Sequence, residues 1–378
     1  MVIQRRHPIG GRDLRPIDQI DDLHPIDQID LDVGRDVMGK VRETIGERAM
    51  VQEDASGNTP VVFVTRMLPG HLNPGSPLDR LSQSFNVDIW PDENPPTAEE
   101  FRKKLRTASA VVTTIAETVD DKALEDASHL KVVAQLGVGY DNIDVALCNS
   151  KGIFVTNTPD VVTDATADLT WALLLGATRR IKEANDAIRT SNWGPWHPSW
   201  MLGQSIKGKT LGIVGPGRIG QAVAERAQGF QMKILYHGTR PKDAFPGSFS
   251  SLEGLLSGSD FVSVHLPLNA STTEYCDRSF FGAMKPTGIF INTGRGGLVN
   301  QPDLHYALTN NVITAAALDV TTPEPLAATH ELMMLPNCII TPHIGSATHE
   351  ARLEMANMAV DSIIEALQGR TPATKVTL

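Results

Sequence analysis

The stretch Gly215-Pro216-Gly217-Arg218-Ile219-Gly220, at the centre of residues 210–240, decides the fold of this chain. The apolar run 211–214 before these glycines predicts a strand that is buried on both faces. After them an alanine-rich stretch without proline predicts a helix, and residues 233–236 predict a second strand. A glycine turn between a strand and a helix, followed by another strand, is the context that a dinucleotide-binding fingerprint requires.

Each glycine of this turn has a physical reason. Gly215 allows the tight turn, Gly217 lets backbone amides approach a pyrophosphate, and Gly220 lets the helix pack closely on the strand. Arg218 and Ile219 open the helix, whose unpaired N–H groups face an anion. We therefore predict that these residues bind a dinucleotide.

The residues after the second strand indicate which dinucleotide. NAD sites usually have an acidic residue there, to hold the ribose 2′-hydroxyl. This chain has Gly238, followed by Thr239, Arg240 and Lys242, which offer room, a hydroxyl and positive charge to a 2′-phosphate. We predict that NADPH is preferred, with NAD possible, and that Thr239 and Arg240 contact the cofactor. The alternative is a solvated basic turn.

Composition limits the class of protein. A chain of 378 residues is comfortable for two domains, and a net charge of −10 argues against nucleic acid as the main ligand. The three cysteines have no paired spacing, which predicts neither a disulfide framework nor a zinc site. Cysteines without paired spacing indicate a reducing compartment, and we expect a cytoplasmic location. No apolar run reaches the ~18 residues that cross a bilayer, and we expect no membrane association.

The remaining chain reads as alternating strands and helices, which predicts parallel sheets covered by helices. Residues 1–58 lack sustained periodicity, and we expect a disordered extension outside the catalytic fold. The fold class expected is α/β with two doubly wound parallel-sheet domains, a Rossmann dinucleotide-binding domain at 159–344 and a flavodoxin-like substrate domain at 59–158 and 345–378. The expected strands are 61–64, 110–114, 132–135, 153–156, 261–265, 289–293, 315–319 and 338–341, and the expected helices include 98–105, one long stretch at 164–189 and 347–368.

Three polar residues stand where strands of the predicted dinucleotide domain end: Arg295, Glu324 and His343. Ligands of open parallel sheets bind beyond the carboxyl ends of the strands. An arginine there can hold a carboxylate with two hydrogen bonds, and a histidine can exchange a proton with an alcohol or ketone oxygen. A glutamate beside the histidine would orient it and favour its charged form. Singly, each could instead be a surface cation, a turn residue or a helix cap.

From about residue 61 to the C-terminus the sequence resembles the D-2-hydroxyacid dehydrogenase family. Four motifs carry the resemblance: the glycine turn 215–220, Asn292-Thr293-Gly294-Arg295-Gly296-Gly297, residues 317–326, and Pro342-His343-Ile344-Gly345-Ser346-Ala347-Thr348. The resemblance implies that Arg295 binds the carboxylate and carbonyl oxygen of a 2-keto acid. It makes His343 the proton donor in reduction and Glu324 its partner.

The resemblance also extends the predicted site. It implies that the backbone N–H groups of Val138 and Gly139 hold the carboxylate; a plain turn is the alternative. Asp319 and Ser346 join the predicted substrate site, and Pro267, Thr293 and Gly345 the predicted cofactor site. No metal is expected, because the charged triad already explains the chemistry.

Within the family the motifs are most similar to glyoxylate/hydroxypyruvate reductases of the animal type. These relatives also share the segment Trp193-Gly194-Pro195-Trp196-His197-Pro198-Ser199-Trp200. The similarity implies a homodimer in which Trp196 reaches the active site of the partner subunit. An interface loop without substrate contact is the alternative. Thr239-Arg240 replaces the arginine–glutamine pair of these relatives, which weakens the expected preference for NADPH.

The sequence thus predicts an oxidoreductase that reduces glyoxylate and hydroxypyruvate to glycolate and D-glycerate by hydride transfer from NADPH. Two alternatives stay open. One is an NAD-linked D-3-phosphoglycerate dehydrogenase, which would have an acidic residue at position 238. The other is a transcriptional corepressor of the same fold that senses the dinucleotide.

Overall fold

The computed structural model describes residues 59–71 and 73–377, so the predicted N-terminal extension lies outside the described part. The described strands form one sheet of five strands and one of seven. All strand pairings in both sheets are parallel. The predicted fold class, two parallel-sheet α/β domains, is confirmed.

The first sheet has the strand order β2-β1-β3-β4-β5, which is the flavodoxin-like order. The sequence did not predict β2, because an edge strand that alternates polar and apolar residues has no continuous apolar run. The elements are β1 (Val61–Val64), α2 (Pro77–Ser82), β2 (Asn86–Ile89), α3 (Ala98–Leu105), β3 (Ala110–Thr113), β4 (Val132–Gln135), α4 (Val145–Ser150) and β5 (Phe154–Thr156).

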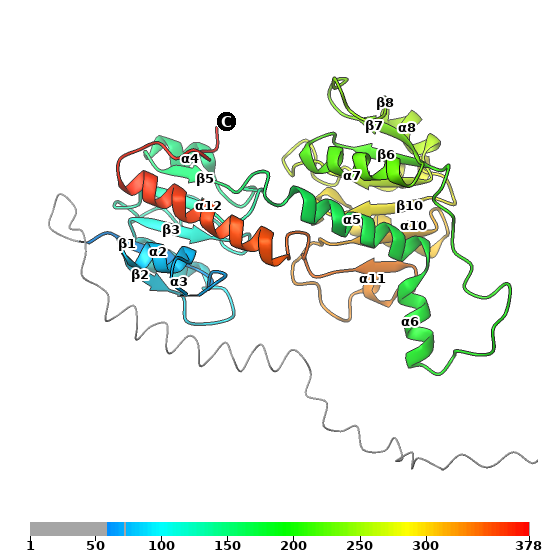
Figure 1. Cartoon of the computed structure of the whole chain (residues 1–378), viewed down its shortest axis with the longest axis horizontal. Helices are drawn as coiled ribbons and strands as arrows, with labels where there is room; N and C mark the ends of the chain where they lie inside the picture. The colour runs from blue at the N-terminus through cyan, green and yellow to red at the C-terminus, as the bar shows by residue number, and fades with distance from the viewer. Residues whose placement is uncertain (1–58, 72, 378) are drawn as a thin grey trace, which may run out of the picture. The chain divides into compact units, whose positions relative to one another are not determined.

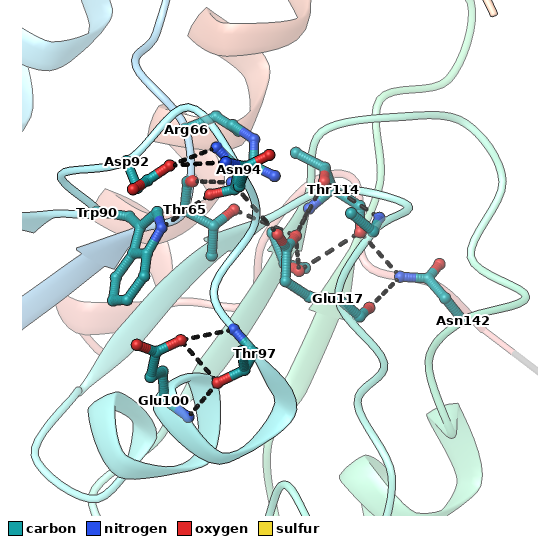
Figure 2. Close-up of polar contacts among 12 residues, drawn as sticks. Thr65, Arg66, Trp90, Asp92, Asn94, Thr97, Glu100, Thr114, Glu117 and Asn142 are labelled. Atoms are coloured by element: carbon teal, nitrogen blue, oxygen red, sulfur yellow. Dashed lines mark hydrogen bonds and ion pairs between the residues drawn. The ribbon is translucent and has the colours of Figure 1, made fainter. Parts of the chain in front are cut away.

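Helix α3 shows how the local sequence sets an element. Thr97 accepts a hydrogen bond from the N–H of Glu100, and the Glu100 carboxylate accepts one from the N–H of Thr97 at 2.8 Å (Figure 2). This capping box satisfies two N–H groups that a helix start would otherwise leave unpaired. Phe101 and Leu105, one turn apart, are the buried residues of the helix.

The second sheet has the order β12-β11-β10-β9-β6-β7-β8. The chain order reverses between β6 and β9, so this is the point where open α/β sheets bind ligands. The elements are α5 (Thr163–Thr178), α6 (Ile181–Arg189), β6 (Thr210–Val214), α7 (Arg218–Gly229), β7 (Lys233–His237), β8 (Ser248–Phe249), α8 (Leu252–Gly258), β9 (Phe261–Val264), α9 (Arg278–Ala283), β10 (Ile289–Asn292), the 3₁₀ turn η1 (Gly296–Leu298), α10 (Gln301–Thr309), β11 (Ala315–Leu318), α11 (Glu331–Met334) and β12 (Cys338–Ile340).

Alternation along the strands of this sheet divides its core into two layers. Ile213 packs with Trp171 and Val223, which come from α5 and α7. The next residue, Val214, points to the other face and packs with Leu255 and other residues of α8, α9 and α10. Figure 1 shows α5 and α7 side by side on one face of the strands. Because helices cover both faces of this sheet, the ends of its strands are the part that a ligand can reach.

The last helix, α12 (His349–Leu367), packs against α2 and β4 of the first sheet (Figure 1). The chain therefore passes from the first sheet to the second and returns. No helix of the described residues is long and apolar enough to span a membrane.

The prediction of one long helix at 164–189 is wrong, because the structure has two helices there, α5 and α6. Arg180 adopts a left-handed conformation with φ of 54° and separates the two helices. The carbonyl of Thr178 accepts a hydrogen bond from the N–H of Gln204 instead of continuing a helical ladder. A contact with a distant segment thus ends α5, at a place where the sequence has neither glycine nor proline.

Candidate active site

The glycine turn has the geometry of an anion site. Gly215 has a φ of 97°, and a Cβ atom there would lie 2.7 Å from the carbonyl oxygen of His265. A Cβ on Gly220 would overlap the carbonyl oxygen of Gly215. Gly217, by contrast, faces open space and begins α7, whose first N–H groups are capped by no side chain. Those N–H groups and the positive helix end fit a pyrophosphate.

The other predicted cofactor residues lie along the carboxyl ends of neighbouring strands. Ile219 is in the first turn of α7, and Pro267 follows β9. The Nε of Arg218 lies 2.5 Å from Asp160, in an exposed ion pair with the segment between β5 and α5. The hydroxyl of Thr293 is bonded to that of Thr170 at 2.9 Å. Its side chain is therefore turned into the protein, and a cofactor would meet the backbone of Thr293, not its hydroxyl.

Arg295 follows β10, and its guanidinium is held on two sides. Its Nε donates to Asp141 at 2.8 Å, and its Nη1 donates to the carbonyl of Gly294 at 3.0 Å. Among the described residues its Nη2 has no acceptor, and this atom lies against Gly139, where a Cβ would overlap it. The arginine is thus fixed in direction while one end of its fork stays available for a carboxylate.

The segment that contacts this arginine offers further donors. The carbonyl groups of Gly137, Val138 and Gly139 all accept hydrogen bonds from the protein. Within residues 59–71 and 73–377, the N–H groups of Val138 and Gly139 donate none. Two consecutive free N–H groups beside Arg295 make a site for a small carboxylate.

His343 and Glu324 form a pair. The Nδ1 of His343 lies 2.8 Å from a carboxylate oxygen of Glu324, and each side chain is 28% exposed. The other oxygen of Glu324 accepts the N–H of Thr321 at 2.9 Å. His343 has a φ of 54°, a left-handed conformation that is uncommon for a side chain with a Cβ. With Nδ1 on the carboxylate, Nε2 is the ring atom left to exchange a proton.

Glu324 stays ionised in this pair. Burial raises the pKa of Glu324, but the hydrogen bond and charge of His343, the N–H of Thr321 and the charge of Arg295 lower it, and the net pKa lies below its ordinary value. Since the folded pKa is the lower one, the carboxylate stabilises the fold at neutral pH, and this contribution is lost as the pH falls through that pKa. The pair with His343 therefore favours the charged form of the Glu324 carboxylate.

Asp319, predicted to bind substrate, has a different position. It is 1% exposed, and its carboxylate accepts from the Thr341 hydroxyl at 2.6 Å and from the N–H groups of Ile344 and Gly345 at 2.9 and 2.7 Å. With both oxygens engaged, Asp319 holds the loop of His343 in its left-handed turn. The structure thus gives Asp319 a positioning function in the His343 loop, and contact of Asp319 with the substrate stays a prediction. The adjoining Gly345 is buried and Ser346 half-buried.

His265 is one of two histidines in the described part of the chain that lie beside the glycine turn; the other, His237, ends β7, and its carbonyl accepts the N–H of Gly215. The Nε2 of His265 is bonded to Ser263 at 2.8 Å. Burial lowers the pKa of His265 to about 4, so its imidazole is neutral at physiological pH. A neutral imidazole is a weak acid, so His265 is unsuited to protonate a substrate oxygen.

Trp196 is not brought together with the triad within this chain. It is 86% exposed, and Trp193 and Trp200 of the same loop are 67% and 41% exposed. With Arg179 and Leu202, the loop lines a shallow depression on the surface.

The sequence did not predict the contact of Asp141, and it predicted Lys242 only as positive charge for a phosphate. Asp141 orients Arg295, and Lys242 donates to the carbonyl of Pro216 and to Gln221, both at 3.1 Å. Asp141 directly follows the Gly137–Tyr140 segment, so its polar side chain at a strand exit was the available signal. Lys242 is the cation nearest the glycine turn in the stretch that already indicated a phosphate.

Comparison with known proteins places these features in context. Residues 171–345 match the family model of D-isomer specific 2-hydroxyacid dehydrogenase, NAD binding domain. The chain is 43% identical over 325 residues to the glyoxylate reductase of Aeropyrum pernix, covering 84% of this chain and 96% of that protein. The glyoxylate reductase of Thermococcus litoralis is also 43% identical, with the same coverage.

Two solved structures resemble this one. A protein of Thermus thermophilus matches with a TM-score of 0.78 and 42% identity, over 84% of this chain and 100% of that chain. An NADPH-dependent glyoxylate/hydroxypyruvate reductase of Sinorhizobium meliloti, solved with NADP and malonate, matches with a TM-score of 0.73 and 31% identity. That match covers 85% of this chain and 97% of the other.

Proposed function

Since the chain belongs to the D-isomer specific 2-hydroxyacid dehydrogenase family, whose members are NAD(P)-dependent oxidoreductases, we propose that it reduces glyoxylate and hydroxypyruvate with NADPH. The products are glycolate and D-glycerate. One observation carries this proposal: Nη2 of Arg295, which has no acceptor among the described residues, lies against Gly139, and in the same part of the chain the N–H groups of Val138 and Gly139 donate no hydrogen bond. Glyoxylate reductases among the relatives, and one that is also named for hydroxypyruvate, support this substrate class.

The chain's own groups would bind the keto acid and supply a proton. Arg295 and the N–H groups of residues 138 and 139 would bind the carboxylate of the keto acid. This would fix the orientation of its carbonyl carbon. His343, oriented by Glu324, would give a proton from its Nε2 to the carbonyl oxygen. The bound nicotinamide supplies hydride to the carbonyl carbon. Asp319 keeps the His343 loop in place during this exchange.

A contact beside the glycine turn supports the preference for NADPH. A Cβ on Gly238 would lie 2.8 Å from Cδ of Pro216 and 2.9 Å from its Cγ, so the proline ring opposes any side chain there. The acidic residue that would select the 2′-hydroxyl of NAD is therefore sterically disfavoured as well as absent. Lys242, bonded to the turn itself, adds positive charge on the same side.

Replacing Arg240 with alanine is expected to weaken NADPH binding and to leave NADH binding nearly unchanged. Arg240 is exposed and has no ion pair among the described residues, so its charge is available to a phosphate. A charge-assisted phosphate contact contributes roughly 1.5–3 kcal/mol, or about one to two decades of affinity. Fluorescence titration of both cofactors measures this, and Lys233→Ala, at the opposite end of β7, is the control. Equal losses for the two cofactors would contradict the phosphate contact.

The tryptophan loop supports a homodimer. Three large exposed rings on one loop form an apolar patch that soluble proteins rarely leave uncovered. A two-fold partner would cover both copies of the patch at once. In such a dimer Trp196 would reach the partner's pocket and limit the substrate to two or three carbons. A cytoplasmic location remains a prediction.

We expect a dimer in solution and expect Trp196→Ala to retain part of the glyoxylate turnover while accepting bulkier 2-keto acids. Light scattering at micromolar concentration measures the assembly, and kcat/KM over a series of 2-keto acids of increasing size measures the pocket. Trp90→Phe, at a tryptophan outside this loop, is the control. A fully active monomer would contradict the dimer, and an unchanged substrate series would contradict the pocket contact.

The decisive test is an assay of NADPH and NADH oxidation with glyoxylate, hydroxypyruvate and phosphohydroxypyruvate. The proposal expects turnover of the first two with NADPH. Preference for NADH with the phosphorylated substrate would favour a phosphoglycerate dehydrogenase. Tight NADH binding with negligible turnover would favour a dinucleotide sensor.

A further inference from the structure

The free N–H groups of Val138 and Gly139 are directed by contacts on the opposite side of their peptide planes. The carbonyl of Gly137 accepts the N–H of Thr158 at 3.0 Å, and the carbonyl of Val138 accepts the side-chain amide of Asn157 at 2.8 Å. In a trans peptide the C=O of one residue and the N–H of the next point in opposite directions. Fixing these two carbonyls therefore fixes the N–H groups of Val138 and Gly139, and turns them away from the end of β5.

Of these two contacts, one uses a side chain and can be changed without altering the backbone. Asn157 follows β5 directly and is half-buried. Its amide nitrogen makes the bond to Val138, so it sets the peptide whose N–H belongs to Gly139. Gly139 is also the residue against which Nη2 of Arg295 lies.

A second amide fixes the following peptide. The Nε2 of Gln135, which is fully buried, donates to the carbonyl of Gly139 and to the side-chain oxygen of Asn142, both at 3.2 Å. Asn142 in turn donates to the carbonyls of Thr114 and Glu117 at 2.9 and 2.7 Å, as Figure 2 shows. The segment is thus attached to the end of β3 as well as to that of β5.

The attachment at β3 is itself rigid. Glu117 is 3% exposed, and one of its carboxylate oxygens accepts from the hydroxyls of Thr65, Thr113 and Thr114 and from the N–H of Thr114 (Figure 2). A buried carboxylate with four donors is costly to disturb, because any lost partner leaves charge unpaired. The backbone carbonyls that hold Asn142, those of Thr114 and Glu117, therefore lie in a rigid segment.

We propose that Asn157 is a positioning residue that aims the backbone N–H of Gly139 at the substrate's carboxylate, and that Gln135 supports it by holding the peptide that follows. The proposal rests on the function proposed above for this segment. Neither side chain touches the substrate. Each acts by holding a carbonyl on the far side of a peptide plane, so that the amides are oriented before the carboxylate arrives.

Asn157→Ala tests this in the full-length protein. The KM for glyoxylate is expected to rise about tenfold, the equivalent of roughly one hydrogen bond, while kcat falls less than about threefold and the Kd of NADPH is unchanged. Asn157→Leu, which is similar in volume but has no donor, is expected to show the same rise in KM, with the same small change in kcat and an unchanged Kd of NADPH. Asn337→Ala is the matched control, since its amide also donates to a backbone carbonyl at 2.9 Å, that of Thr314. It is expected to leave the KM unchanged.

Binding of oxalate, measured by calorimetry in the presence of NADPH, separates this inference from the proposed reaction. Oxalate affinity needs no turnover, and we expect it to fall about tenfold in both Asn157 variants. Wild-type oxalate binding without reduction of either keto acid would overturn the proposed reaction but not the inference. Unchanged oxalate affinity in the Asn157 variants, or no oxalate binding by the wild type, would overturn the inference. So would equal weakening of oxalate and NADPH binding.

Discussion

Replacement of His343 by glutamine is expected to lower kcat for keto-acid reduction by about 10²–10⁴-fold, the usual loss when a positioned general acid is removed. Glutamine keeps much of the side-chain volume and can still reach Glu324, but its amide has no proton to give. The affinity for NADPH is expected to be unchanged, because the glycine turn lies between β6 and α7, whereas His343 follows β12. Steady-state kinetics and NADPH titration on the same preparation measure both quantities.

His129→Gln is the control for this experiment, since His129 is exposed and precedes β4, far along the chain from the triad. The control should retain wild-type kcat. A His343 variant with kcat within threefold of wild type would contradict the assignment of the proton donor. Parallel losses of kcat and NADPH affinity would instead indicate collapse of the site.

Replacement of Gly139 by alanine is expected to reduce kcat/KM for the keto acid by about 10²-fold or more, the loss that follows misplacement of a catalytic group by about 1 Å. The new Cβ would overlap Nη2 of Arg295 and lie 2.5 Å from its Cζ. The guanidinium would have to move, although Asp141 and the carbonyl of Gly294 hold it in place. Stability should change little, because the atom displaced is the far end of a long side chain.

Gly137→Ala provides a matched control two residues away. Its Cβ would find no atom nearer than 3.9 Å, so the same chemical change should leave kcat/KM close to wild type. Thermal melting of both variants verifies that they fold. Similar kinetics for the two alanine variants would contradict a close approach of Arg295 to Gly139 in the working enzyme.

The elements that the sequence predicted well share one physical cause. Strands such as β1 and β11 are runs of apolar residues that are almost all buried, and α3 has its cap and its apolar face in sequence. Polar residues that follow such strands are predicted to meet at one edge of the sheet, and the structure pairs His343 with Glu324 there.

What the sequence did not predict depends on side-chain direction and distant contacts. Asp319 and Thr293 both follow strands of the second sheet, yet their side chains turn inward to Thr341 and Thr170. A position after a strand says nothing about which way its χ1 rotamer points. The division of α5 from α6 at Arg180 likewise depends on a bond to Gln204, which local propensity does not encode.

The division of the site between two sheets has a consequence for engineering. Arg295, Glu324 and His343 all follow strands of the seven-stranded sheet, whereas Val138 and Gly139 follow β4 of the five-stranded sheet. Under the proposed function, the proton donor and the backbone donors for the carboxylate would come from different sheets, so a chimera could exchange residues 59–158 without altering the proton donor. Arg295, which would also bind the carboxylate, would stay with the second sheet. Because α12 packs against α2 and β4, such a graft would have to include α12, which lies beyond His343 in the chain.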